Sequence, residues 1–205
     1  SNLSEEAKTF FLNSDVSAVI AGIKPMSYVQ PQLEEKKWGF IKKSVGLSKT
    51  DLIALQRTSE QLGILTLRNE QLEATRNETN NDMKNVALML VINLHKTIDA
   101  MRTSGTFTED EISEFIEDPI ASQYKSNNNG KPDYIKNYRI GYQLGYPTSD
   151  VKEYIRSAEL KNKPPFDLTD EEQEFLSSSV AARKGITVSG SNGGVTWVTS
   201  NPESP

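Results

Sequence analysis

The sequence predicts a mainly α-helical protein. We expect a compact multi-helix domain around a central buried helix over residues 82–102, with a small C-terminal β-hairpin. Three observations support this fold class: helix-start signals recur, one segment carries a strong apolar stripe, and the marked strand pattern lies near the C-terminal end. The expected domains are a helical domain over residues 1–185, a hairpin appendage over 186–199 and a flexible tail over 200–205.

The helix-start signals are pairs of residues with the spacing of a capping box. In this arrangement a hydroxyl accepts a hydrogen bond from the backbone N–H three residues on, and an acidic side chain at that position reaches back. Pro119 then ends the second of these helices. The pairs are Ser48 with Asp51, Thr108 with Glu111 and Thr169 with Glu172.

The predicted central helix depends on hydrophobic periodicity between residues 82 and 102. Apolar side chains recur there at steps of three and four, which is typical of a buried helical stripe. The continuous apolar run over 86–92 adds apolar surface on the remaining sides, so we expect neighbours on more than one face. Upstream, residues 63–81 predict either a polar helix that leads into the central one or an exposed excursion. The stripe consists of Met83, Val86, Ala87, Leu90, Leu94, Ile98 and Met101.

The C-terminal region has the pattern of strand, glycine-rich loop and strand. Residues 186–189 and 195–199 flank the loop over 190–194. An isolated hairpin is marginal in water, so we expect it to pack on the helices, pair with another chain or be disordered. Trp197 is a candidate binding residue here, since the hairpin could add to a partner's sheet by backbone pairing.

Tyrosines spaced four residues apart are the most informative feature of the chain. Residues at i and i+4 are neighbours on a helix, and a helix over about residues 132–144 is expected, with Gly145 ending it. Two interpretations remain open: the rings cover the core, or they form a recognition patch or ligand pocket. The candidate binding residues are Tyr134, Tyr138, Tyr142 and Tyr146.

Residues 140–151 have the pattern I-G-x-x-L-G-Y-P-x-x-D-V. This pattern resembles a segment of some uncharacterised bacterial protein families. The resemblance implies a helix, a tight turn and a second helix, with Gly145 adopting a turn conformation that a β-carbon would strain. It implies no catalytic role.

Composition excludes several classes of site. A formal net charge of −5 disfavours a nucleic-acid binder driven by phosphate attraction, and the absence of cysteine removes thiol chemistry and disulfides. One histidine, His95, excludes most histidine-rich metal sites. No apolar run approaches the roughly 20 residues that span a bilayer. We therefore expect no metal, no cofactor and no transmembrane segment.

Catalytic signals are weak. His95 could act as a general base with Asp99 four residues on, and paired carboxylates within 109–118 could support glycoside hydrolysis. However, acidic residues in a first helical turn complement the helix dipole, so a capped and solvated helix face is favoured. We predict no catalytic residue.

The sequence therefore predicts a non-catalytic bacterial protein that binds a protein partner or a small ligand. The alternative is a cryptic hydrolase that uses carboxylates or His95. The chain begins with Ser1 and Asn2 instead of Met, which suggests a trimmed start and leaves export or periplasmic location and the cytoplasm as equal expectations.

Overall fold

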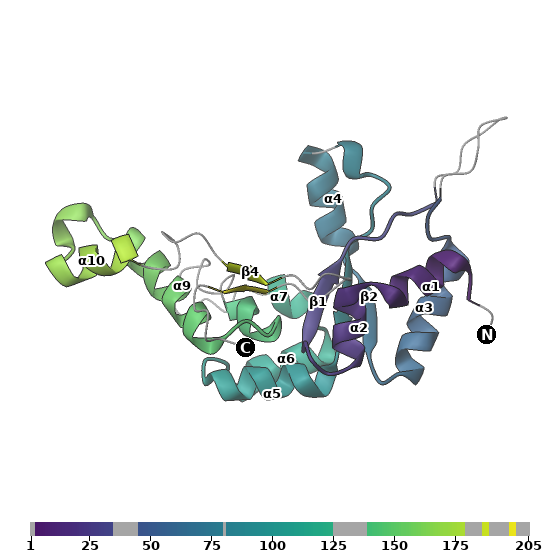
Figure 1. Cartoon of the computed structure of the whole chain (residues 1–205), viewed down its shortest axis with the longest axis horizontal. Helices are drawn as coiled ribbons and strands as arrows, with labels where there is room; N and C mark the ends of the chain where they lie inside the picture. Colours follow the sequence, from purple (N-terminus) through teal and green to yellow (C-terminus); the bar gives the residue numbers. More distant parts are fainter. Residues whose placement is uncertain are drawn as a thin grey trace. The chain divides into compact units, whose positions relative to one another are not determined.

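The structure is a computed structural model in which the chain separates into two compact units, unit 1 over Ser1–Lys96 and unit 2 over Thr97–Pro205 (Figure 1). The predicted boundaries after residues 185 and 199 stay predictions. The predicted hairpin loop and tail lie outside the described residues. The structure describes residues 3–34, 45–79, 81–124, 139–178, 186–188 and 197–199.

Unit 1 alternates helices with three short strands. Local signals explain the helix boundaries. The Asn13 side chain accepts from the N–H of Asp15 at 2.9 Å and so caps the second helix where the first ends. Ser48 and Asp51 form the predicted capping box. The elements are α1 Glu5–Leu12, α2 Ser14–Ile20, β1 Met26–Val29, α3 Lys49–Gln61, β2 Leu65–Arg68, α4 Glu70–Thr79, η1 Asn81–Met83, β3 Met89–Ile92 and α5 Leu94–Ser104, which continues into unit 2.

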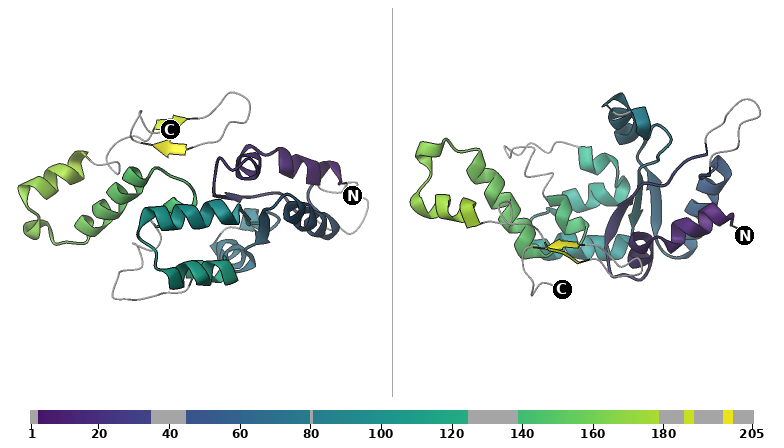
Figure 2. Two further views of the ribbon diagram at one scale, coloured as in Figure 1. Left: turned by 90° about the horizontal axis from the view of Figure 1, so that it is seen from below. Right: turned by 45° about the horizontal axis from the view of Figure 1, so that its top comes forward.

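The three strands form an antiparallel sheet in the order β1-β3-β2. Val91 is paired with Ser27 on one side and Thr66 on the other, so these three residues share a sheet face. Helices α1, α2 and α3 lie on one side of this sheet (Figures 1 and 2). The buried Thr66 hydroxyl donates to Ser59 Oγ at 2.6 Å, which ties β2 to α3.

The core of unit 1 lies between these helices and the sheet. Each fully buried aliphatic or aromatic side chain contributes about 1.5–3 kcal/mol relative to exposure, which makes this cluster the main source of stability in the unit. Its members come from α1, α2, α3, strands β1 and β3 and the residues just before β2; they include Ala7, Phe10, Val16, Val19, Val29, Leu55, Ile64, Met89 and Val91.

The predicted fold class is wrong in two respects, although the protein is mainly α-helical. Residues 82–102 do not form a central helix, because residues 89–92 form β3 and the helix begins only at Leu94. The sheet of the fold lies in unit 1 and is not the C-terminal hairpin. All four β3 residues are buried, and neighbouring residues in a strand point to opposite faces. Such a strand has a continuous apolar run that periodicity alone does not distinguish from a buried helix.

Helix α4 is fixed by a buried carboxylate. The Glu73 side chain is 7% exposed and accepts hydrogen bonds from Arg68 Nη2 and the Leu88 N–H, both at 2.7 Å. Asn69 Oδ1 accepts from the Leu72 N–H at 3.0 Å and so caps the helix. Arg76 Nη2 donates to the Met83 carbonyl at 3.1 Å, and also to Val86. These bonds join α4 to β2 and to the segment before β3. For residues 63–81 the sequence left two alternatives, a polar helix or an exposed excursion, and the structure has helix α4 within this range.

We predict that Glu73→Ala destabilises unit 1 by about 2–4 kcal/mol, because the Arg68 guanidinium loses its buried carboxylate partner and the Leu88 N–H loses its acceptor. Glu70→Ala is the matched control, since Glu70 lies 3.4 Å from the same Arg68 but its side chain is 76% exposed. An exposed pair contributes under about 1 kcal/mol. Urea unfolding measures both variants, and equal losses would contradict the assigned role of Glu73.

Unit 2 is helical in its described part apart from one strand pair. The predicted capping boxes at Thr108 and Thr169 are both present, and the helix before Pro119 ends at Glu117. Strand β4 pairs antiparallel with β5. Figure 2 shows α9 and α10 as neighbours, in agreement with their contacts. After α5 the elements are α6 Glu109–Glu117, α7 Ala121–Tyr124, α9 Thr148–Lys161, η2 Pro165–Asp167, α10 Asp170–Ser178, β4 Ile186–Val188 and β5 Trp197–Thr199, with a further helical turn over 139–143.

Candidate functional site

A tight turn after residues 139–143 positions Tyr142. The Gly145 N–H donates to the Tyr142 carbonyl at 3.1 Å, and the Tyr146 N–H donates to the Gly141 carbonyl at 2.9 Å. This is a Schellman C-cap, which requires the positive φ of +79° at Gly145. The predicted helix end at Gly145 is therefore confirmed. A β-carbon at Gly141 would lie 2.9 Å from Val151 Cγ2, so glycine there allows the turn to pack closely on α9.

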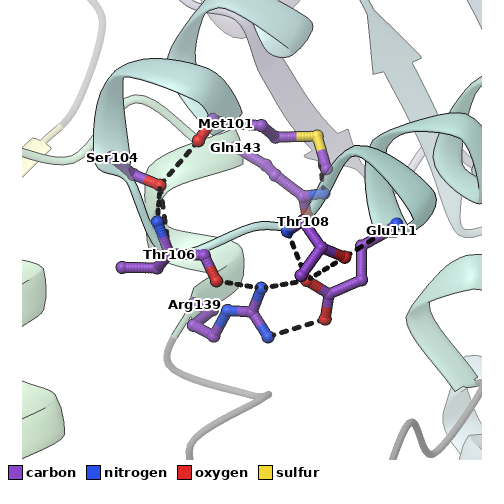
Figure 3. Close-up of polar contacts among 7 residues, drawn as sticks. All are labelled: Met101, Ser104, Thr106, Thr108, Glu111, Arg139 and Gln143. Carbon is purple, nitrogen blue, oxygen red and sulfur yellow. Dashed lines mark hydrogen bonds and ion pairs between the residues drawn. The ribbon is translucent and has the colours of Figure 1, made fainter.

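Arg139 anchors the same turn to α6. Its Nη1 donates to Glu111 Oε1 at 3.0 Å, and its Nη2 donates to Glu111 Oε2 at 2.9 Å and to the Thr106 carbonyl at 2.6 Å (Figure 3). The guanidinium carbon also lies 4.1 Å from the centroid of the Phe107 ring. The bidentate geometry is the strong form of an arginine–carboxylate contact. Residues 139–143 are thereby held against the connection between α5 and α6.

Glu111 has two structural roles. Its carboxylate accepts from Arg139 and from the Thr108 N–H at 2.8 Å, and its own N–H donates to Thr108 Oγ1 at 3.2 Å. Burial raises the pKa of Glu111, but the hydrogen bonds from Arg139 and Thr108 outweigh it and hold the pKa below the ordinary value. The helix cap and the ion pair thus depend on one ionised carboxylate.

Tyr142 carries a buried hydroxyl that has no hydrogen-bond partner in the described part of the chain. The residue is 3% exposed, and its ring packs edge-on against Phe107 with centroids 6.4 Å apart. Burial raises the pKa of Tyr142, and the charge of Arg139 acts in the opposite direction. A buried polar group without a partner costs about 1–3 kcal/mol, so this hydroxyl is an exception to the usual pairing.

Tyr142 lines a pocket of about 450 Å³. This volume lies within the range of about 300–1,000 Å³ that is typical of small-molecule sites. One wall is a single face of α9, because its residues recur at steps of three and four. The other lining residues come from the connection before α6, the turn over 139–143, the segment after α9 and α10. The lining consists of Thr106, Tyr142, Lys152, Ile155, Arg156, Glu159, Leu160, Lys163 and Glu172.

Contacts of α9 and the segment after it with α10 fix part of this lining. Lys163 Nζ lies 2.7 Å from Glu172 Oε1, and Glu172 also accepts from the Thr169 N–H at 3.1 Å. The hydrogen bond from Lys163 is the main cause of the lowered pKa of Glu172, to which the charge of Arg156 contributes. The Arg156 guanidinium lies 4.3 Å from the centroid of the Phe175 ring. The Glu172 carboxylate therefore already accepts hydrogen bonds from two groups of the protein.

Of the predicted binding residues, Tyr142 lines the pocket and Tyr146 does not. Tyr146 is half-buried and lies beside Gly141. Tyr134 and Tyr138 lie outside the described residues. Trp197 begins β5, and the structure describes its backbone only.

Sequence reasoning missed the basic and apolar face of α9 as part of a site. Lys152, Ile155, Arg156 and Glu159 all line the pocket and belong to this face. Their spacing of three and four residues was a usable signal, because it places them along one side of a helix. The spacing along α9 could not indicate that Tyr142 lines the same pocket as these α9 residues.

The residues named for the hydrolase alternative do not line this pocket. His95 is exposed on α5, and the acidic residues over 114–118 belong to α6 and its C-terminal end. Within the described part of the chain, no group of three or more histidine, cysteine or acidic residues could hold a metal ion. The pocket therefore gives this alternative no support, and it stays a prediction.

Comparisons with protein-family models, curated proteins and solved structures found no match for this chain. Among the described residues, no helix is long and apolar enough to cross a membrane. The chemistry of the pocket is therefore the available guide to function.

We predict that Glu111→Gln removes part of the acid sensitivity of unit 2. A carboxyl group whose pKa is lowered by folding contributes stability above its ordinary pKa of 4.5, and this contribution is lost as the pH falls through the lower folded value. At pH 7 the variant should lose about 1–3 kcal/mol, because a charge-assisted pair and a cap are weakened. Between pH 5 and pH 3 its stability should fall less steeply than that of the wild type.

Asp110→Asn is the matched control for this experiment, since Asp110 is exposed in the same helical turn. Its loss at pH 7 should stay below about 1 kcal/mol, as for an exposed charge near a helix N-terminus. Urea unfolding at each pH measures all three proteins. Parallel pH profiles for wild type and Glu111→Gln would contradict the role of the Arg139–Glu111 pair.

Proposed function

We propose that the protein is a non-catalytic binding module that holds a small molecule in the pocket beside Tyr142. The observation that carries this proposal is the buried Tyr142 hydroxyl, which has no hydrogen-bond partner among the described residues and belongs to a residue of the pocket wall. A ligand acceptor at this hydroxyl would supply the missing hydrogen bond, and the pairing would favour the bound state over the empty one.

Position separates Tyr142 from the other unpaired hydroxyl. Ser157 Oγ is also buried and, within the described ranges, has no hydrogen-bond partner, but Ser157 does not line the pocket. Tyrosine suits a ligand site, because it combines a large apolar ring with one hydrogen-bonding group that fixes orientation. Tyr142 is therefore the residue to which we assign ligand orientation.

The pocket wall is organised without a ligand. Arg139 binds Glu111 and the Thr106 carbonyl, and the Gly145 turn fixes the other end of the Tyr142 segment. A wall that is already ordered loses little conformational freedom on binding, which favours affinity for a small molecule. This supports a binding pocket and not a surface that forms only around a partner.

The charges of the pocket favour binding without catalysis. Glycoside hydrolysis and related acid–base chemistry need two carboxylates in different roles. Glu172 is bonded to Lys163 and to the Thr169 N–H, which leaves Glu159 as the remaining carboxylate of the lining. Binding of a protein partner through Tyr134, Tyr138 or Trp197 stays a prediction.

We predict that Tyr142→Phe weakens ligand binding without lowering the stability of the ligand-free protein. Removing an unpaired buried hydroxyl should leave the free energy of unfolding unchanged or raise it by up to about 1 kcal/mol. Loss of one ligand hydrogen bond should weaken binding about 5- to 10-fold. The probes are 3-phenylpropanoate, 3-phenylpropanamide and phenyl phosphate, titrated into the full chain by two-dimensional NMR.

Tyr146→Phe is the matched control, because it removes a hydroxyl four residues along the chain from a residue that does not line the pocket. It should bind each probe as the wild type does. The proposal is overturned when no probe binds, or when Tyr142→Phe binds them all with unchanged affinity. A loss of more than about 1 kcal/mol on Tyr142→Phe would show that the hydroxyl has a protein partner.

A further inference from the structure

We infer that the ligand is a small organic anion, with a carboxylate or phosphate group on an apolar body, and that Lys152 and Arg156 bind its anionic group. This inference rests on the proposed binding function. It assigns the ligand's anionic group to the two cations of α9 and to the Tyr142 hydroxyl, which donates to the same group.

Among the described residues that line the pocket, positive side chains outnumber negative ones. Lys152 and Arg156 lie one turn apart on α9 and line the pocket, and neither makes an ion pair with a described residue. The third lining cation, Lys163, is paired with Glu172 at 2.7 Å. Two cations and Glu159 therefore remain, which gives a local excess of positive charge in a chain of net charge −5. A small anion is the ligand that such an excess attracts.

Arg156 is held in a position suited to an oxyanion. Its guanidinium lies against the Phe175 ring, 4.3 Å from the ring centroid. Stacking on an aromatic face keeps the guanidinium planar and ordered while its edge donors stay available, and these donors match the two oxygens of a carboxylate or phosphate. The contact with Phe175 thus orders the cation without neutralising it.

The remaining lining favours an apolar body on the same ligand. Ile155 and Leu160 lie on the α9 face next to the two cations, and Tyr142 adds its ring. Apolar surface with a few placed polar groups is the usual composition of a small-molecule site. An anion without an apolar part, such as inorganic phosphate, would leave this surface unused.

The test compares ligands that differ in charge but not in size. We expect 3-phenylpropanoate to bind the full chain at least 10-fold more tightly than 3-phenylpropanamide. Arg156→Gln and Lys152→Gln should each weaken binding of the acid about 5- to 10-fold and change binding of the amide less than 2-fold. Arg156→Lys should restore part of the acid affinity, because it keeps the charge but loses the planar fork.

Lys161→Gln is the matched control, since Lys161 is exposed on α9 but does not line the pocket. It should leave both affinities unchanged, and the NMR spectrum of each variant shows that it is folded. A second comparison uses phenyl phosphate. If it binds more tightly than 3-phenylpropanoate, the site prefers a phosphate, and if it binds more weakly, the site prefers a carboxylate; either result supports the inference.

The two proposals fail in different ways. Equal binding of acid and amide, with both weakened by Tyr142→Phe, overturns the anionic ligand and leaves the binding function intact. The assignment of the anionic group to Lys152 and Arg156 is also overturned when Lys161→Gln weakens binding of 3-phenylpropanoate as much as Arg156→Gln does. Failure of all three probes to bind overturns both proposals.

Discussion

The bidentate ion pair between Arg139 and Glu111 is the constraint on which the described part of unit 2 depends. Their side chains are 11% and 23% exposed, so the pair is largely withdrawn from water and has well-defined geometry. Glu111 is at the same time the acidic member of the α6 capping box, whose N-cap is Thr108, and Arg139 also binds the Thr106 carbonyl. One carboxylate therefore sets the start of a helix, the path of the connection before it and the position of the turn that carries Tyr142.

The segment that carries Tyr142 combines paired and unpaired groups. The Glu111 carboxylate and the Gly145 turn have hydrogen bonds within the protein, whereas the Tyr142 hydroxyl and the Arg139 Nε atom are buried without a partner among the described residues. Natural proteins break local rules most often at functional sites, where the cost is offset by what the site does. Tyr142 lines the same pocket as Lys152 and Arg156, which make no ion pair with a described residue, and this shared lining is what links the Tyr142 donor to an anionic ligand.

Local interactions made part of this structure predictable from sequence. The capping boxes at Ser48, Thr108 and Thr169, and the helix end at Gly145, each depend on residues within a few positions of one another, and all are present. Strand β3 was not predictable in this way, because a strand buried on both faces has no alternation to detect. The Arg139–Glu111 pair joins residues 28 positions apart, and no local pattern indicates such a contact. The tyrosine spacing singled out Tyr142, but only the fold places it opposite α9.

The most direct test of the central claim is the ¹³Cζ NMR signal of Tyr142 in protein with labelled tyrosine, recorded while 3-phenylpropanoate is added. This carbon is bonded to the hydroxyl oxygen, so its chemical shift responds when the hydroxyl gains a hydrogen bond. We predict a saturable change at Tyr142, identified by its absence in Tyr142→Phe, and little change at Tyr146. A Tyr142 signal that stays constant at saturating probe, or a change confined to Tyr146, would contradict a ligand site at this hydroxyl.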